Sequence, residues 1–151
     1  MSVMYVEGGL NCHWEEGCEP RVKDGNAGID LRAKEKVIIE ERGVYTVKTG
    51  FYAEIPCGYC GFLLPRSGSS DTGFKLANTI GLIDPSYRGE IIAKVVKDWE
   101  NFSEWPIEIE QYERICQLVI VPYAIVTQLN WKESLDETER GDTGFGKSGR
   151  F

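Results

Sequence analysis

Three polar segments of this chain carry side chains suited to binding phosphate groups and acting on them. Residues 65–68 (PRSG) follow a strand-like run, so a guanidinium, a hydroxyl and backbone N–H groups could converge on phosphate oxygens. Residues 81–90 place Asp84 and Tyr87 in a turn between two strand-like runs. Residues 140–151 combine four glycines with basic side chains, which suits a loop that closes over an anion. Each segment alone is also typical of a polar turn or, for the last, of a disordered tail.

The cysteines and the single histidine do not indicate a metal site or a nucleophile. Five cysteines, an odd number in a chain of this size, argue against a disulfide framework. Cys57 and Cys60 have CxxC spacing, but no second ligand pair accompanies them, and the surrounding proline and glycines predict a hairpin turn. His13 lies in a segment without a nucleophile pattern. We therefore expect the chemistry to rest on other side chains.

The elements that must position the polar segments are predicted to be strands. Short runs rich in β-branched and aromatic residues indicate an all-β fold, a β-sandwich or closed barrel. The runs are 37–39, 44–47, 51–55, 61–64, 91–96, 107–109, 115–121 and 125–129. Alternation over 107–110 predicts a strand with one exposed face, and the apolar run 118–121 predicts one covered on both faces. Only 67–72 and 132–139 are candidates for helical turns.

Size and charge limit the classes of partner. With 151 residues and 17.0 kDa the chain has room for one core, which we assign to a single β domain over 1–139, followed by a glycine-rich flap over 140–151. A net charge of −7 and a pI near 4.8 argue against nucleic-acid binding. No apolar run approaches the roughly 20 residues of a membrane helix, and the N-terminus lacks the pattern of a secretion signal. An intracellular, cytoplasmic protein is expected.

Taken together, the polar segments resemble a known family. Five segments match, in order, the five motifs of the homotrimeric deoxyuridine triphosphatases (dUTPases): 27–33 (AGIDLRA), 65–68 (PRSG), Asn78 with 81–90 (GLIDPSYRGE), 114–118 (RICQL) and 140–149 (RGDTGFGKSG). The resemblance extends from about residue 20 to the C-terminus. It implies a jelly-roll-like β-sandwich with a flexible C-terminal arm, assembly into a homotrimer, and Mg²⁺ as cofactor. The implied reaction is hydrolysis of dUTP to dUMP and pyrophosphate, which limits uracil in DNA and supplies dUMP for thymidylate synthesis.

The resemblance also implies roles for individual residues. Asp84 would orient and deprotonate the attacking water, with Gln117 as a second holder, because a carboxylate within hydrogen-bond reach is the group such a base needs. Tyr87 would pack on the deoxyribose and exclude a 2′-hydroxyl. Asp30 would hold Mg²⁺ through a water molecule, in line with the reluctance of magnesium to lose its hydration shell.

The substrate-binding residues implied by the resemblance come from three motifs. Uracil would be recognised at a hairpin edge over 78–83, and the phosphates would be bound by the second motif of one subunit and the fifth motif of another. Phe145 would stack on the uracil ring. The full set is Arg66, Ser67, Gly68, Asn78, Gly81, Ile83, Tyr87, Arg140, Phe145, Gly146, Lys147, Ser148 and Gly149.

The sequence departs from the family at several positions. Tyr112 replaces the usual glycine before the fourth motif, Asp71 adds an acid near the second, and Lys147 stands where a small residue is common. The segment 9–17 has no family counterpart that we can place. Two alternatives stay open at this point: a relative that deaminates dCTP, and a catalytically weak regulatory protein that keeps the nucleotide pocket.

Overall fold

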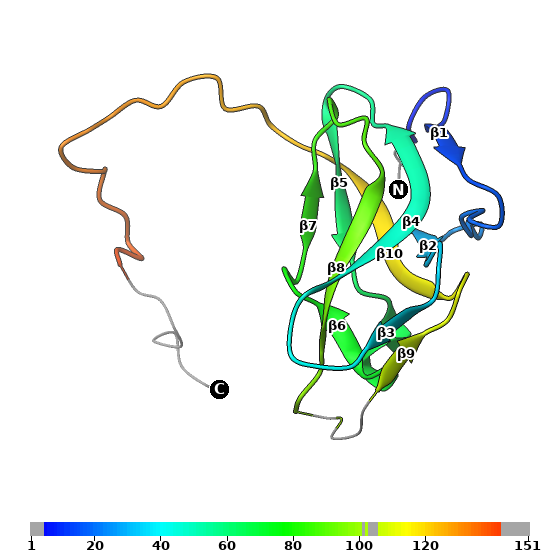
Figure 1. The fold of residues 1–151 in the computed structure, drawn as a ribbon. Helices are drawn as coiled ribbons and strands as arrows, with labels where there is room; N and C mark the ends of the chain where they lie inside the picture. The colour runs from blue at the N-terminus through cyan, green and yellow to red at the C-terminus, as the bar shows by residue number, and fades with distance from the viewer. Residues whose placement is uncertain (1–4, 101, 103–105, 143–151) are drawn as a thin grey trace.

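The computed structural model describes residues 5–100, 102 and 106–142, and its fold is an all-β sandwich (Figure 1). Within these ranges no helix is long and apolar enough to cross a membrane. The elements are β1 (Asn11–Trp14), β2 (Gly28–Arg32), β3 (Val37–Ile39), β4 (Tyr45–Glu54), β5 (Tyr59–Leu64), the 3₁₀-helix η1 (Ser67–Asp71), β6 (Phe74–Leu76), β7 (Gly81–Ile83), β8 (Ile91–Lys97), β9 (Ile107–Ile109) and β10 (Arg114–Pro122).

Two four-stranded antiparallel sheets form the layers of the sandwich. One sheet has the order β1-β4-β8-β6, the other has the order β2-β10-β5-β7, and β3 pairs with β9 in a separate ribbon. The chain changes sheet after every strand, so strands that follow each other in sequence do not pair. This arrangement confirms the predicted jelly-roll-like all-β fold.

The core lies between the two sheets and follows the alternation of their strands. Val47, Phe51, Ile91 and Val95 of β4 and β8 are fully buried, whereas Lys48, Ile92 and Lys94 between them are exposed. Leu118 of β10 closes the core from the other layer. The prediction that β9 has one exposed face is confirmed, but the apolar run of β10 is not covered on both faces, because only Leu118 is buried and residues 119–121 are half-buried.

The predicted strands 44–47 and 51–55 are one strand, β4, interrupted by a bulge. The register of β4 against β8 shifts between Lys48 and Phe51. Gly50 has φ +61°, and the buried Thr49 hydroxyl donates to the Ile91 carbonyl and accepts from the Phe51 N–H. The hydroxyl thus takes the place of the ladder bonds that the bulge interrupts. Both apolar runs lie largely in strand, as predicted, but the prediction of two separate strands was wrong.

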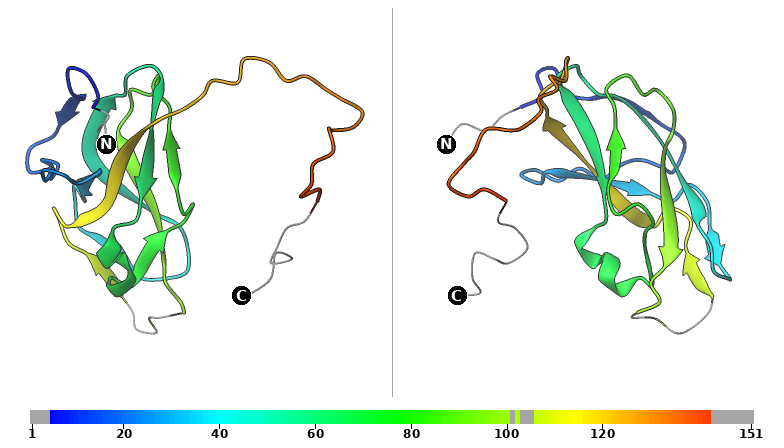
Figure 2. Two further views of the ribbon diagram at one scale, coloured as in Figure 1. Left: turned by 180° about the vertical axis from the view of Figure 1, so that it is seen from behind. Right: turned by 90° about the vertical axis from the view of Figure 1, so that its left-hand side faces the viewer.

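Two predictions beyond β10 are wrong. Residues 125–129 form no strand and 132–139 form no helical turn; the chain from 123 to 142, which we call the C-terminal arm, runs away from the sandwich (Figures 1 and 2). Strand propensity requires a partner strand, and within the described residues the arm has none. Leu129 and Trp131 are 89% and 85% exposed. A large apolar surface therefore lies open on the single chain.

The CxxC segment is a turn, as predicted, but not a hairpin. Tyr59 N donates to Pro56 O at 3.1 Å and Gly58 has φ +88°. The strands on either side, β4 and β5, belong to different sheets, so this turn connects the two layers. Cys57 is exposed and Cys60 is buried, and neither forms a disulfide.

Tyr112 adopts the backbone conformation that favours glycine. Its φ is +65°, and its N–H donates to Ala33 O at 2.7 Å while its own carbonyl accepts from Arg32 Nη1 at 2.9 Å. The ring lies over Gly17, where any Cβ would overlap it. The departure from the family glycine therefore keeps a tight turn and uses the ring to cover the N-terminal segment.

The bulge in β4 predicts a specific sensitivity at Gly50. A Cβ there would lie 2.7 Å from Cys18 Sγ and would have to adopt a left-handed φ, so Gly50→Ala should lower the free energy of unfolding by about 2–4 kcal/mol. Gly43→Ala is the matched control, because its Cβ would meet nothing nearer than Tyr45 at 3.9 Å. Urea unfolding at equal protein concentration measures both. Equal midpoints for the two variants would contradict this account of the bulge.

Candidate active site

A polar cavity gathers residues from the first, second and fourth motifs. Gly28 and Asp30 of β2, Arg66 and Ser67 after β5, and Gln117 of β10 line a space of about 270 Å³, which we call the cationic pocket. Neighbouring strands bring them together, because Gln117 pairs with Asp30 on one side and with Leu64 on the other. The structure therefore assembles five residues that are up to 89 positions apart in sequence.

Asp30 forms ion pairs with two arginines in this pocket. Its Oδ1 lies 3.1 Å from Arg66 Nε and its Oδ2 accepts a hydrogen bond from Arg114 Nη1 at 3.0 Å. Arg66 also donates through Nη1 to the Arg114 carbonyl at 3.1 Å. All three side chains are partly buried, which reduces solvent screening. The contacts hold both guanidinium groups at the floor of the pocket.

Gln117 is held with its amide facing the same pocket. Its Nε2 donates to Pro65 O at 2.9 Å, and its Oε1 packs against Gly28 so closely that a Cβ at that position would overlap it. The glycine of the first motif therefore leaves room for the glutamine of the fourth. Ser69 caps the adjoining turn, because its hydroxyl accepts from Arg66 N at 3.0 Å. Asp71, the added acid, does not line the cavity.

Five lining residues were not predicted as site residues from the sequence. Arg21, Lys23 and Asn26 precede the first motif, Gly28 lies within it, and Arg114 opens the fourth. Only their spacing before the motif, a proline followed by two cations, offered a signal. The pairing of Arg21 with Asp30, which brings the segment to the pocket, is a single isolated bridge that no sequence pattern marks.

A second cavity lies between β7 and β8 and contains Asp84 and Tyr87. It has a volume of about 190 Å³ and is lined further by Ile83 and Glu90 and by apolar residues of both strands. Tyr87 N donates to Asp84 O at 3.1 Å, which closes the turn, and the Tyr87 hydroxyl donates to Glu90 O at 2.9 Å. The ring rests on Gly89, where a Cβ would overlap it. We call this cavity the β7–β8 pocket.

The β7–β8 pocket has one unpaired strand edge. β7 pairs only with β5, and β8 pairs with β4 and β6, so within the described residues the facing edges of β7 and β8 share no ladder. Such an edge presents backbone N–H and C=O groups in a fixed pattern. Gly81 begins β7, with Asn78 directly before it in an exposed turn; the Asn78 side chain does not line the cavity.

The two pockets lie apart on one chain. β2 and β7 are the outer strands of their sheet, separated by β10 and β5, so they are three strand spacings or roughly 14 Å apart. Along the strands, Ile83 lies opposite Gly61 of β5 whereas Gln117 lies opposite Leu64, so Asp84 follows the far end of β5 from Arg66 and Gln117. Asp84 is therefore not brought to Asp30, Arg66 or Gln117 within a subunit. Arg140 lies on the exposed C-terminal arm. The remaining predicted residues, Phe145, Gly146, Lys147, Ser148 and Gly149, lie outside the described residues.

The buried thiol beside the cationic pocket is not a nucleophile. Burial, together with the smaller effect of the Asp30 carboxylate and against the lowering effect of Arg66, raises the pKa of Cys116 to about 12. The thiol therefore stays protonated at neutral pH. Across the described ranges, no group of three or more His, Cys, Asp or Glu side chains could hold a metal ion.

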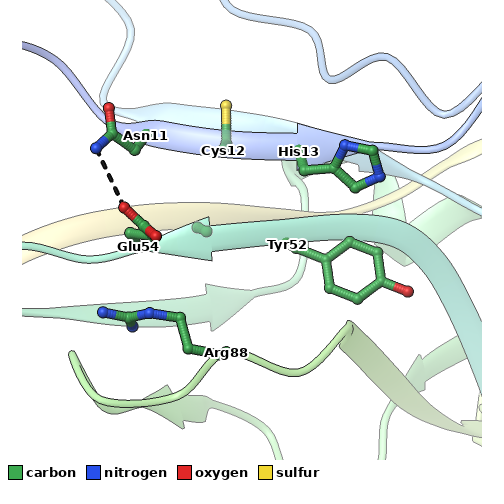
Figure 3. Close-up of a pocket in the computed structure, with 7 residues that line it drawn as sticks. Asn11, Cys12, His13, Tyr52, Glu54 and Arg88 are labelled. Atoms are coloured by element: carbon green, nitrogen blue, oxygen red, sulfur yellow. Dashed lines mark hydrogen bonds between the residues drawn. The ribbon is translucent and has the colours of Figure 1, made fainter.

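A third cavity contains none of the predicted site residues. It has a volume of about 410 Å³ and lies between β1, β4 and Arg88 (Figure 3). His13 packs against Tyr52 with ring centroids 5.7 Å apart, whereas the Cys12 sulfur points to the other side of the strand. Burial also raises the pKa of the Cys12 thiol. Because sequence neighbours on a strand face opposite ways, these two residues form no catalytic pair.

Comparison with known proteins identifies relatives over most of the chain. The family profile described as dUTPase matches residues 16–149. The deoxyuridine 5'-triphosphate nucleotidohydrolase of Tropheryma whipplei is 39% identical over 131 residues, covering 86% of this chain and 87% of the relative. That of Alcanivorax borkumensis is 42% identical over 132 residues and covers 84% of each.

Solved structures give the same result. A dUTPase variant of Staphylococcus bacteriophage 80alpha, solved with dUpNHpp, has a TM-score of 0.79 and 28% identity, covering 94% of this chain and 99% of its own. These comparisons give no support to the deaminase or the regulatory alternative. With the motif residues gathered in two pockets of an all-β sandwich, the chain belongs to the dUTPase family.

Proposed function

We propose that this chain hydrolyses dUTP to dUMP and pyrophosphate by attack of water on the α-phosphorus. The observation that carries the proposal is the cationic pocket, where Arg66, Ser67 and Gln117 meet around Asp30. Cations and hydroxyls fixed in advance stabilise a polyanion and its transition state without reorganising during the reaction. We place this activity in the cytoplasm, where it limits uracil in DNA and supplies dUMP.

Assembly is part of the proposal, because one chain separates the groups that the reaction needs together. Asp84 would have to reach a phosphate held in the cationic pocket, and three strand spacings lie between them. A closed ring of subunits that each face the next solves this with one repeated interface. The apolar C-terminal arm, with Leu129 and Trp131 exposed, supplies a surface that neighbouring subunits would cover. A homotrimer satisfies both requirements.

Within such a site, Asp84 acts as the general base. Its carboxylate is exposed at the mouth of the β7–β8 pocket, so it can take the proton of a water that approaches the α-phosphate from solvent. Gln117 of the facing subunit holds the same water through its amide, which is fixed by Pro65 and Gly28. Holding the water in line converts the attack into a unimolecular step.

Recognition of the nucleoside falls to the β7–β8 pocket. The unpaired edge of β7, including Ile83 and Gly81, offers backbone donors and acceptors to the uracil edge, with Asn78 at the end of the strand. A base with the opposite donor pattern would leave buried polar groups unpaired, which costs about 1–3 kcal/mol for each group. The Tyr87 ring, held against Gly89, packs on the deoxyribose and leaves no room for a 2′-hydroxyl.

The cationic pocket fits Mg²⁺ only if the ion is shared with the substrate. The described residues offer no cluster of three metal ligands, and both Asp30 oxygens already contact arginines. Each carboxylate oxygen has a second lone pair, so Asp30 can still accept from a metal-bound water. This suits an ion that keeps several waters and takes its other ligands from phosphates. When bound, Mg²⁺ would offset the charge of the triphosphate.

The C-terminal residues complete the proposed site. Arg140, Lys147 and Ser148 would bind phosphate oxygens with the amides of Gly146 and Gly149, while Phe145 stacks on uracil. This assigns 140–151 as a flap that closes over the substrate, separate from the β domain over 1–139. The triphosphate is then bound from two sides, by these residues and by Arg66, Ser67 and Gly68.

The first prediction concerns assembly. In solution the protein should have a mass near three times 17.0 kDa by multi-angle light scattering at micromolar concentration, because neither the arm nor the active site is complete in one chain. A fully active monomer would overturn the proposed shared site.

The second prediction concerns the base. Asp84→Asn keeps the shape of the turn but removes the proton acceptor, so kcat for dUTP should fall by roughly 10²–10⁴-fold with much less change in nucleotide binding. The matched control is Ser86→Ala, which changes an exposed residue of the same turn that does not line the pocket. Both values come from pyrophosphate release. Activity of Asp84→Asn within about threefold of the parent would assign the base to another residue.

The third prediction concerns the flap. Truncation after Glu139 should leave a folded oligomer, because no buried residue of the described core is lost. Phe145→Ala should lower kcat/KM by roughly 5- to 150-fold, the equivalent of stacking worth about 1–3 kcal/mol. The truncation should lower it much further, because the phosphate contacts are lost as well. A truncated protein that hydrolyses dUTP at the intact rate would show that the segment is a tail without function.

A further inference from the structure

The segment that precedes the first motif brings two more cations to the cationic pocket. Arg21 and Lys23 line this pocket beside Asp30, Arg66 and Arg114. Both belong to the stretch before the first motif, to which the sequence analysis assigned no role. Their side chains form no hydrogen bond or ion pair with any described residue, so their charge is not committed elsewhere in the chain.

The position of Arg21 is fixed by its backbone. Its N–H donates to Asp30 O and its carbonyl accepts from Asp30 N, both at 2.9 Å, in an isolated antiparallel bridge. Residues directly opposite in an antiparallel pair project to the same face. The Arg21 guanidinium therefore extends over the face of β2 that carries the Asp30 carboxylate. Although Arg21 is exposed, its backbone position is fixed by the bridge.

Lys23 is positioned by the turn that follows. Asn26 N donates to Lys23 O at 3.0 Å, and Gly25 in this turn has φ +81°. The turn begins two residues after Arg21 and leads directly into β2, so the two hydrogen bonds between Arg21 and Asp30 and this turn together hold the segment beside β2. Arg21 and Lys23 consequently form one rim of the pocket, opposite to the second motif.

Arg21 and Lys23 increase the positive charge of the cationic pocket. Arg66 and Arg114 share the Asp30 carboxylate, so these three side chains together carry a net charge of only +1. Arg21 and Lys23 raise the formal charge of the pocket lining to +3. In a partly buried site, cations without an acid partner attract a polyanion more strongly than cations that are already neutralised.

The strand order indicates which phosphates the rim would meet. Gln117 lies on β10, Asp30 on the adjacent β2, and Arg21 on the far side of Asp30, so the backbones of Arg21 and Gln117 are two strand spacings or roughly 10 Å apart. In the proposed function, on which this inference rests, Gln117 stands at the α-phosphate. Arg21 and Lys23 are then at the opposite end of the triphosphate chain.

We propose that Arg21 and Lys23 bind the terminal phosphate of the substrate and make this enzyme select triphosphates over diphosphates. Arg21 offers a planar fork of donors to phosphate oxygens, and Lys23 adds a mobile point charge. Both act by binding and neither touches the reacting α-phosphorus, so their effect falls on KM and on affinity. The chemical step, which depends on Asp84 and Gln117, is left unchanged.

The test compares nucleotides that differ by one phosphate. Dissociation constants of the full-length protein for dUpNHpp and dUDP are measured by calorimetry with Mg²⁺ present, for the parent, Arg21→Ala, Lys23→Ala and the double variant. Each single change should weaken the binding of dUpNHpp by roughly 3- to 30-fold, and the double change should weaken it further. The binding of dUDP should weaken by less than about twofold in every variant. KM for dUTP should rise in parallel while kcat stays within about twofold.

Controls separate the charge from the fold of the segment. Val22→Ala changes an exposed residue between the two cations, and Lys48→Ala removes one positive charge from the other sheet; both should bind dUpNHpp as the parent does. Arg21→Lys should recover most of the loss, because it keeps the charge. Equal weakening of dUpNHpp and dUDP, or no weakening of either, would overturn this inference. A parent protein that does not hydrolyse dUTP would instead overturn the proposed function.

Discussion

The carboxylate of Asp30 holds two like-charged groups together, and the geometry of the cationic pocket depends on it. Arg66 follows β5 and Arg114 opens β10, so without an acid between them two guanidinium groups would face each other. Asp30 forms an ion pair with each and thereby joins three segments that are far apart in sequence. The same residue pairs through its backbone with Arg21 on one side and with Gln117 on the other. One side chain thus fixes the position of most polar groups in this pocket.

The order of strands in one sheet explains why the nucleotide site belongs to an assembly. β10 and β5 fill the middle of the sheet, and the cationic pocket beside β2 and the β7–β8 pocket lie toward its opposite edges. One subunit therefore does not bring the two pockets together. In the proposed homotrimer, a neighbouring subunit would supply the second pocket, and the apolar arm beyond Pro122 would provide area for the contact.

Sequence reasoning found the fold class and most strands because they rest on local patterns. The runs around Ile91, Ile107 and Leu118 are strands since β-branched residues alternate or cluster there. β1, β2, β6 and β7 escaped prediction because each is no more than five residues long and mixes glycine or polar residues with apolar ones. Residues 125–129 have strand propensity but no partner strand among the described residues. For the site, ordered motifs were sufficient for Asp30, Arg66 and Gln117, whereas Arg21 depends on one long-range bridge.

The contact between Tyr112 and Gly17 has a consequence for how this sequence can change over time. The ring occupies the space that any side chain at position 17 would need, and Tyr112 itself holds a φ of +65° that costs a non-glycine residue on the order of 1 kcal/mol. A substitution at Gly17 has to displace the Tyr112 ring and also adopt a φ of +77°, whereas Tyr112 can become glycine and relieve its own strain. Descendants of this chain would therefore lose the tyrosine more readily than the glycine.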